Sequence, residues 1–306
     1  MRFFITGDCH GDFKKIDFFC MNHKTSKDDY MIILGDAGLN YWLDKTDRKL
    51  KCNLSQLPIN FLIIHGNHEE RAFEIDTYKE RKWQNGIVYY EEEFPDILFA
   101  KDGEVYDFNG KKGIAIGGAY SVDKNYRLSA GLPWFESEQP SAEIKAYVEK
   151  QLKEYDWTVD FVLSHTCPLS LEPEELFLDG IDQSSIDKST EEWLEQIHKK
   201  LKYQKWYFGH FHDNRHYATT EMLFEEIKEL GAEDFLQRLG KPKYMRDEEV
   251  MFYWDNDQDY KLGRIVVVDA YGTFEQSKEV SYDIQVSDGA WYKHIPESLV
   301  ERLDEG

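Results

Sequence analysis

Side chains that can bind a metal ion or transfer a proton recur in one pattern along the first 213 residues. Five short apolar runs, such as "FLII" from 61 and "WYF" from 206, are each followed by such a residue within a few positions. The residues concerned are Asp8, His10, Asp36, Asn67, His68, His165, His210 and His212. Carboxylate oxygens and imidazole nitrogens are suitable ligands for Zn, Fe, Mn and Co ions. The set is too large for one tetrahedral ion and suits two ions that share a carboxylate, an arrangement that can hydrolyse phosphoesters.

Each of these residues also has a simpler interpretation. A single His after a strand is commonly a structural hydrogen-bonding residue, Asp8 and Asp36 are in positions where they could form Asx turns, and Asn67 could cap a helix. In "WYFGHFHD", however, His210 and His212 are two residues apart, so on an extended backbone they point to the same side. Because the pattern repeats at five places, we expect one shared site.

The elements that must position these residues are short buried strands. Four or five apolar residues that stop at turn-forming or polar residues are typical of such strands. The intervening segments predict helices, among them 141–154, with Ser141 as N-cap, and 190–202, with a capping box from Ser189 to Glu192. Strands that alternate with helices indicate an α/β protein, in which ligands collect at the carboxyl ends of the strands.

Three regions depart from this alternation. Residues 87–118 predict several short strands with no helix between them, either a second sheet or an antiparallel part of the first. Residues 119–140 have no clear period and predict a long, functional loop. After 213 we expect a helix over 222–239, a strand over 263–268 and a short helix from 296.

The five motifs "GDCHG", "GDAG", "GNHE", "SHTCP" and "GHFH" occur in the order found in calcineurin-like metallophosphoesterases. The resemblance covers about residues 2–213 and is similar to a bacterial and phage branch described as serine/threonine-phosphatase-like. It implies an α/β fold of two packed, mainly mixed β-sheets flanked by helices, a four-layer sandwich. We therefore expect a catalytic domain over 1–213 and a C-terminal extension over 214–306 that packs on or near it.

The resemblance also implies a role for each motif residue. Asp36 would bridge two metal ions drawn from Mn, Fe, Zn, Ni or Co. The first ion would be held by Asp8, His10 and His212, and the second by Asn67, His165 and His210. A hydroxide between the ions would be the nucleophile. His68 would not be a ligand; it would stabilise charge on the substrate and protonate the leaving oxygen, with Asn67 near a phosphoryl oxygen.

One position departs from the protein phosphatases of this family. Their second motif continues with an Asp and an Arg, and here those positions hold Leu39 and Asn40. The Arg binds a phosphate dianion through paired hydrogen bonds. Its absence puts phosphoprotein specificity in doubt, and Arg127 in the 119–140 segment is a candidate substitute for substrate binding.

Three functions follow from these observations. The first is a phosphomonoesterase that acts on a phosphorylated small molecule or a phosphoprotein. The second is a nucleotide phosphodiesterase or pyrophosphohydrolase, favoured by the missing Arg and by the aromatic residues of 119–140. The third, more distant, is a non-catalytic interaction protein on the same scaffold. Members of that last kind lack ligands or the general-acid His, whereas here all eight positions are present.

Composition limits the partners and the location. There are 37 Lys and Arg residues against 59 Asp and Glu residues, which gives a net charge of −22. Such a surface repels long nucleic acids but not a small nucleotide bound beside metal ions. The N-terminus is too short in apolar residues for a signal peptide, and no segment is long enough to span a membrane. We expect a cytoplasmic protein; no sequence feature indicates its oligomeric state.

Overall fold

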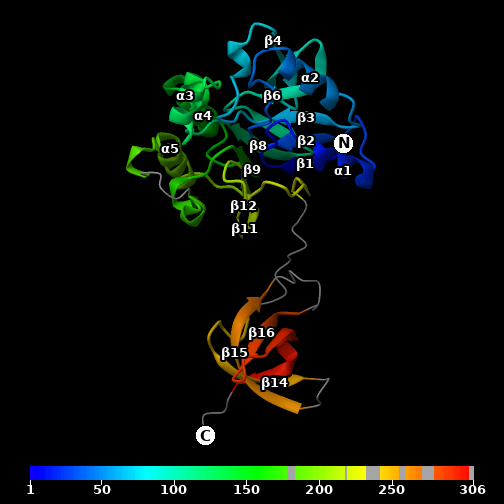
Figure 1. The fold of residues 1–306 in the computed structure, drawn as a ribbon, viewed down its shortest axis with the longest axis vertical. Coiled ribbons are helices and arrows are strands. Elements are labelled where there is room, and N and C mark those ends of the chain that lie inside the picture. Colours follow the sequence, from blue (N-terminus) through cyan, green and yellow to red (C-terminus); the bar gives the residue numbers. More distant parts are fainter. Residues whose placement is uncertain (178–182, 218, 232–241, 255–258, 271–278, 303–306) are drawn as a thin grey trace. The chain divides into compact units, whose positions relative to one another are not determined.

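The structure is a computed structural model, and it describes residues 1–177, 183–217, 219–231, 242–254, 259–270 and 279–302 (Figure 1). The chain divides into two compact units, Met1–Leu230 and Gly231–Gly306. The division falls after the predicted boundary at 213, because strands that follow residue 213 pair with the sheets of the first unit. Among the described residues, no helix is long and apolar enough to cross a membrane.

The first sheet of unit 1 is mixed, with seven strands. In spatial order they are β13 (Lys228–Glu229), β1 (Phe3–Thr6), β2 (Tyr30–Ile33), β3 (Asn60–Ile63), β6 (Phe94–Ala100), β5 (Gly86–Glu91) and β4 (Tyr78–Trp83). The strands β1, β2, β3 and β6 run parallel, while β13, β5 and β4 are antiparallel to their neighbours. The three parallel strands β1, β2 and β3 therefore end at the same edge of the sheet.

The second sheet is also mixed and has six strands. In spatial order they are β11 (Arg215–His216), β12 (Thr220–Met222), β10 (Lys205–Phe208), β9 (Phe161–Ser164), β8 (Lys111–Ile116) and β7 (Val105–Phe108). The strands β12, β10, β9 and β8 run parallel. The predicted strands of 87–118 thus belong to both sheets: β5 and β6 extend the first sheet, and β7 and β8 start the second.

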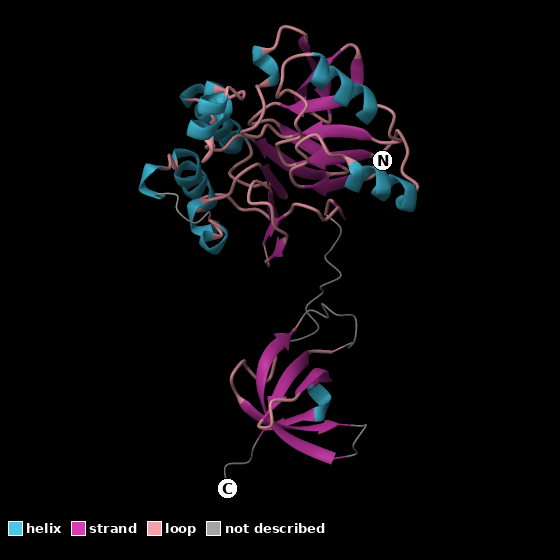
Figure 2. Cartoon of the chain, viewed as in Figure 1, coloured by secondary structure: helices cyan, strands magenta, loops and turns pink. Residues whose placement is uncertain are grey.

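Alternating side chains of each strand divide the core into three layers. On β1, Phe4 packs with helices α1 (Lys14–His23) and α2 (Lys45–Leu54). Its neighbours Phe3 and Ile5 point the other way and pack against the second sheet. The outer face of the second sheet is covered by α4 (Ala142–Glu154) and α5 (Ser189–His198). The order is helix, sheet, sheet, helix, as the helices around the central strands in Figure 2 show, so the predicted fold class is confirmed.

Of the two predicted helix N-caps, one forms in the structure and the other does not. The Ser141 side chain accepts the Ile144 N–H, so the predicted N-cap of α4 forms. The capping box at Ser189 does not form: Ser189 is the first helical residue, and Lys188 holds the cap position without a side-chain hydrogen bond. That prediction is wrong by one residue, because Asp187 instead accepts the Ser189 N–H.

The 119–140 segment is more ordered than a loop. It contains helix α3 (Lys124–Ala130), which ends at Gly131 with a left-handed backbone, and a 3₁₀ turn, η2 (Glu136–Glu138). Short 3₁₀ turns also occur between β9 and α5, over Leu169–Leu171, Glu174–Leu176 and Gln183–Ser185. A further one, η1 (Ala72–Glu74), follows β3.

Unit 2 is a five-stranded antiparallel sheet with its own core. In spatial order its strands are β17 (Trp291–Pro296), β16 (Ser281–Val286), β15 (Asp259–Asp269), β14 (Glu249–Trp254) and β18 (Val300–Arg302). The strand predicted over 263–268 lies within β15. The short helix predicted from 296 is the 3₁₀ turn η6 (Glu297–Leu299). The helix predicted over 222–239 is wrong over 222–231, where β12 ends and β13 lies; 232–239 lie outside the described residues.

Candidate metal centre

The predicted ligands follow the ends of β1, β2, β3, β9 and β10, and the structure brings all of them together. One group consists of Asp8, His10 and His212, whose ligand atoms lie within 4.8 Å of one another. His212 Nε2 is 3.2 Å from Asp8 Oδ2 and 2.9 Å from His10 Nε2. These are the three residues assigned to the first ion.

A second group joins Asp8 and Asp36 to His165, again within 4.8 Å. His165 Nε2 is 2.8 Å from Asn67 Oδ1 and 3.7 Å from Asp36 Oδ1. The His165 ring also packs edge-on against His210, with centroids 4.9 Å apart. A third group combines His10, Asp36 and His68, so His68 lies close enough to be counted with the ligands. The three groups overlap at the carboxylates and at His10.

The backbone at these positions is unusual for residues other than Gly. His10, Asp36, His210 and His212 all have positive φ, between 47° and 70°. Such conformations are uncommon for side chains with a Cβ and gather at functional sites. Close packing explains the preceding glycines: a Cβ on Gly66 would lie 2.0 Å from Asp36 Oδ1, and one on Gly35 would lie 2.1 Å from His165 Nδ1.

The donor set fits metal ions. Asp8 Oδ2 is buried, and its close polar neighbours are two other predicted ligands, His212 Nε2 at 3.2 Å and His10 Nε2 at 3.7 Å. His165 Nδ1 lies 2.7 Å from the Leu34 carbonyl, which can only accept, so Nδ1 carries a hydrogen and Nε2 faces the Asn67 oxygen. That contact is favourable only with a cation or a second proton between the two atoms. The Nε2 atoms of His10 and His212 lie 2.9 Å apart, so their ring nitrogens face the same point and can bind one ion there.

Burial and neighbouring charges shift the pKa values of several predicted ligands. Burial raises the pKa of Asp8, but His212, His165 and His10 more than offset it and hold the pKa below its usual range. Asp36 behaves likewise: burial is outweighed by His165 and His68, which lower its pKa. Burial lowers the pKa of His210 to about 3. Asp8 raises the pKa of His212. Both carboxylates are therefore charged and His210 is neutral at neutral pH, the forms that bind metal ions.

A sequence model of the calcineurin-like phosphoesterase family matches residues 1–214. This chain belongs to that family. Membership implies metal-dependent hydrolysis of phosphoesters, usually with two ions. A comparison with curated proteins found no match.

Solved structures resemble this chain, with low sequence identity. Phosphopantetheinyl hydrolase from Mycobacterium tuberculosis is 12% identical and aligns over 80% of this chain and 98% of that chain, with a TM-score of 0.41. The protein TT1561 of Thermus thermophilus is 11% identical over 86% of this chain and 98% of that chain, also with a TM-score of 0.41. These scores are low, so the family assignment depends on the sequence match.

His68 of the phosphoesterase is held over the metal-ligand cluster by three neighbours. Its backbone N–H donates to Asp36 Oδ1 at 2.8 Å. Its ring lies nearly parallel to Tyr41, with centroids 6.3 Å apart, and Nε2 is 3.9 Å from Asp123 Oδ1. Burial lowers the pKa of His68, and Asp36 partly counteracts this.

A pocket of about 500 Å³ opens from this cluster in the phosphoesterase. One wall, which we call the strand-end wall, consists of His10, Asp36, Asn67, His68, His210, Phe211 and His212. The rest of the lining, which we call the connection wall, comes from the segments 120–123, 172–177 and 183–191. It presents Tyr120, Val122, Asp123, Glu172, Leu176, Phe177, Gln183, Ile186, Lys188 and Glu191.

Arg127 is not among the residues that line this pocket. It is 1% exposed, donates from Nε to the Pro133 carbonyl and from Nη1 to Ser121 Oγ, and lies over the Tyr41 ring. Leu39 and Asn40, which replace the Asp and Arg of the protein phosphatases, are buried. Of the described pocket-lining residues, Lys188 alone is a Lys or Arg. Sequence patterns did not reveal Lys188, since it is one of many charged residues between 172 and 200.

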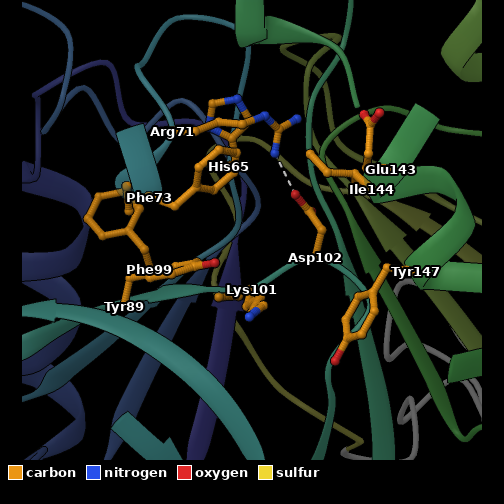
Figure 3. A pocket seen from close by; sticks show the side chains of 12 residues that line it. His65, Arg71, Phe73, Tyr89, Phe99, Lys101, Asp102, Glu143, Ile144 and Tyr147 are labelled. Atoms are coloured by element: carbon orange, nitrogen blue, oxygen red, sulfur yellow. Dashed lines mark hydrogen bonds and ion pairs between the residues drawn. The ribbon is translucent and has the colours of Figure 1, made fainter. Parts of the chain in front are cut away.

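A second, smaller pocket of about 180 Å³ lies beside η1 and α4 (Figure 3). Phe73, Tyr89, Phe99 and Tyr147 form its aromatic lining, and Arg71 and Asp102, which form an ion pair, also line it. His65, which directly precedes the "GNHE" motif, lines this pocket. It is buried and shows no hydrogen bond to a predicted ligand among the described contacts.

Proposed function

We propose that the chain is a phosphoesterase that uses two metal ions held at the ends of β1, β2, β3, β9 and β10. The observation that carries this proposal is the overlap of the ligand groups, in which Asp8 and Asp36 each belong to two. When bound, two such ions neutralise phosphoryl oxygens and lower the pKa of water, so that hydroxide exists at neutral pH. Oxygen and nitrogen donors of this kind suit Mn, Fe, Zn, Ni or Co.

The chain's own residues bind and protonate the substrate. Asn67 lines the pocket, and its amide is proposed to contact a phosphoryl oxygen. His68 also lines the pocket and is proposed to protonate the leaving oxygen. Asp123 faces His68 Nε2 and favours the protonated imidazole that this role needs.

The first substrate class we propose is a phosphomonoester. Two divalent ions held by Asp8, Asp36 and neutral imidazoles leave an excess of positive charge, which complements a doubly charged phosphate. Lys188 on the connection wall adds a cation that can reach into the pocket.

A phosphodiester is the second candidate, and the connection wall favours it. Asp123 and Glu172 add negative charge there, and Glu172 already pairs with Lys188 at 2.7 Å. Apolar side chains such as Val122, Phe177 and Ile186 offer a surface for the second ester group. Of the aromatic residues expected to stack a nucleotide base, Tyr120 lines the pocket, whereas Phe135 is buried and Tyr126 is exposed elsewhere.

The test compares p-nitrophenyl phosphate with its bis-ester, using the purified chain supplied with Mn²⁺. We expect two bound ions per chain and a higher kcat/KM for the monoester. Changing His68→Ala should lower kcat by about 10²–10⁴-fold while the metal content stays the same. The matched control is His23→Ala on α1, where the ring packs on Phe19 outside the pocket.

Three results would change this proposal. Faster turnover of the bis-ester would assign the diester class. Wild-type turnover in His68→Ala would remove its role as proton donor. Two bound ions without turnover of either ester would favour the non-catalytic interaction protein.

A further inference from the structure

Asn67 is an amide among charged and aromatic ligands, and its two ends differ chemically. The oxygen can bind a metal ion, whereas the NH₂ group cannot. In this chain Oδ1 faces His165 Nε2 at 2.8 Å, and Nδ2 donates to Ser121 Oγ at 2.9 Å. Asn67 is 2% exposed, so the protein groups around it determine which end faces which neighbour. The orientation of the Asn67 amide, with its oxygen toward the metal ligands, therefore depends on the hydrogen bond to Ser121.

Ser121 cannot exchange its role with Asn67. Its Oγ accepts a second hydrogen bond from Arg127 Nη1 at 3.1 Å, and a guanidinium can only donate. The acceptor beside the Ser121 hydroxyl is the carboxylate of Glu138, which accepts the Ser121 backbone N–H at 3.3 Å and, in this inference, receives the hydroxyl hydrogen as well. With its hydrogen used for Glu138, Ser121 Oγ can only accept from Asn67. A flipped Asn67 would place its carbonyl oxygen against this acceptor, which is unfavourable.

The bonds run in one direction because both ends of the network are fixed. Arg127 can only donate, and its guanidinium is held by the Pro133 carbonyl and lies over the Tyr41 ring. Glu138 is 3% exposed, and its other oxygen accepts the Trp134 indole N–H at 2.8 Å. Ser121 is 1% exposed. In a site so deeply buried, such a network has a single favourable arrangement.

From this network we infer that Ser121 is a positioning residue for the second metal ion. By accepting from Asn67, and by being oriented by Arg127 and Glu138, it keeps the Asn67 oxygen turned toward His165 and Asp36. The inference rests on the proposed two-metal function and names a part of it that none of the five strand-end motifs contains. It also explains why a buried Arg lies behind the pocket rather than in it.

The test measures Mn²⁺ binding to metal-free protein by titration calorimetry, together with kcat/KM. Wild type should bind two ions. Ser121→Ala should bind one ion as wild type does and the other about 10–100-fold more weakly, the usual effect of removing a group that orients a ligand. Ser121→Thr, which keeps the hydroxyl, should restore the second affinity. A matched control is Thr190→Val, which removes a buried hydroxyl that bonds Gln139 rather than a predicted ligand.

A second variant keeps the inference testable if Ser121→Ala does not fold. Glu138→Gln preserves the shape but lets the Ser121 hydroxyl reverse, so it should weaken the same ion by less than Ser121→Ala. If Ser121→Ala binds both ions as tightly as wild type does, the inference is wrong. If Ser121→Ala does not fold, the same result in Glu138→Gln overturns the inference. So does equal weakening of both ions together with a lower melting temperature, the mark of a merely structural role. Failure of the proposed function appears differently, as fewer than two ions in wild type, and removes the inference with it.

Discussion

The two walls of the main pocket are built by different means. The strand-end wall consists of residues that directly follow parallel strands, so the sheets themselves bring His10, Asp36 and Asn67 to one place. The connection wall consists of short 3₁₀ turns and the segment before α3, which lie between the strands rather than at their ends. Buried pairs hold such connecting segments in place: Arg71 pairs with Asp102 and donates from Nε to the Ser137 carbonyl at 2.7 Å, so it ties the residues after β3 to the 119–140 segment.

Because the two walls are built differently, mutations in them should have different effects. Changes in the strand-end wall should abolish the chemistry, because the ligands contribute charge and donors while the sheets carry the stability. Changes in the connection wall should first affect stability, pH response or substrate affinity. Four variants test this distinction, two of them against the proposed metal site or substrate and two against folding.

Asp36→Asn is expected to have the largest effect. Asparagine can still accept the His68 N–H that Asp36 Oδ1 accepts, so the local fold should persist. The lost charge removes the carboxylate that belongs to two ligand groups. We expect fewer than two ions per chain and a fall in kcat/KM of at least about a thousandfold, roughly 4 kcal/mol of transition-state stabilisation.

The control for that change is Asp12→Asn, an exposed acid two residues beyond His10 that pairs with Lys14. It should leave metal content and rate unchanged. If Asp36→Asn retained two ions and more than a tenth of the rate, the sharing of Asp36 between ions would be wrong.

Arg71→Ala should be the most destabilising of the four changes, because it breaks a buried pair that holds the connecting segments. The Arg71 and Asp102 side chains are 3% and 10% exposed, so removing one leaves a buried charge without its partner. Asp102 also accepts the Gly117 N–H, which ties β8 to the same pair. We expect a loss of about 3–5 kcal/mol in the free energy of unfolding, measured by urea denaturation.

An exposed ion pair provides the comparison. Lys14→Ala breaks the pair with Asp12; the Lys14 side chain is 89% exposed and that of Asp12 is 61% exposed, so the free energy of unfolding should stay almost unchanged. Equal effects of the two variants would mean that the buried Arg71–Asp102 pair stabilises the fold no more than an exposed pair does.

The same contrast explains what could be predicted from the sequence. The strand-end wall follows from local patterns, because an apolar run followed by a polar residue specifies both the strand and the position of the ligand. The connection wall depends on contacts between residues far apart, such as Lys188 near Glu172 or Asn67 near Ser121. No period marks such contacts, and for this reason 119–140 resembled a loop. In 222–231, strand pairing with the sheets overrode a helical pattern.

The third prediction concerns Glu191 of the connection wall and the pH dependence of the free energy of unfolding. Burial raises the pKa of this carboxyl from 4.5 to about 7, and its Oε2 lacks a hydrogen-bond partner among the described residues. Between these values the folded chain keeps a proton that the unfolded chain has released. The free energy of unfolding should therefore fall as pH rises from about 5 to 8, by on the order of 3 kcal/mol from this group.

Glu191→Gln should remove that part of the slope, whereas Glu192→Gln, an exposed neighbour on α5, should not. Urea denaturation at several pH values measures both. An unchanged slope in Glu191→Gln would show that the carboxyl is ionised in the folded chain.

The smallest expected effect concerns Lys188. Because Glu172 pairs with it at 2.7 Å, its charge is largely neutralised before any substrate arrives. Lys188→Met should raise KM for p-nitrophenyl phosphate by about fivefold at most, equivalent to about 1 kcal/mol, and leave kcat unchanged. Glu172→Gln should act in the opposite direction, because it frees the Lys188 charge for the phosphate. If both variants instead raise KM equally, the pair only supports the wall, and the case for a doubly charged substrate then depends on the strand-end wall alone.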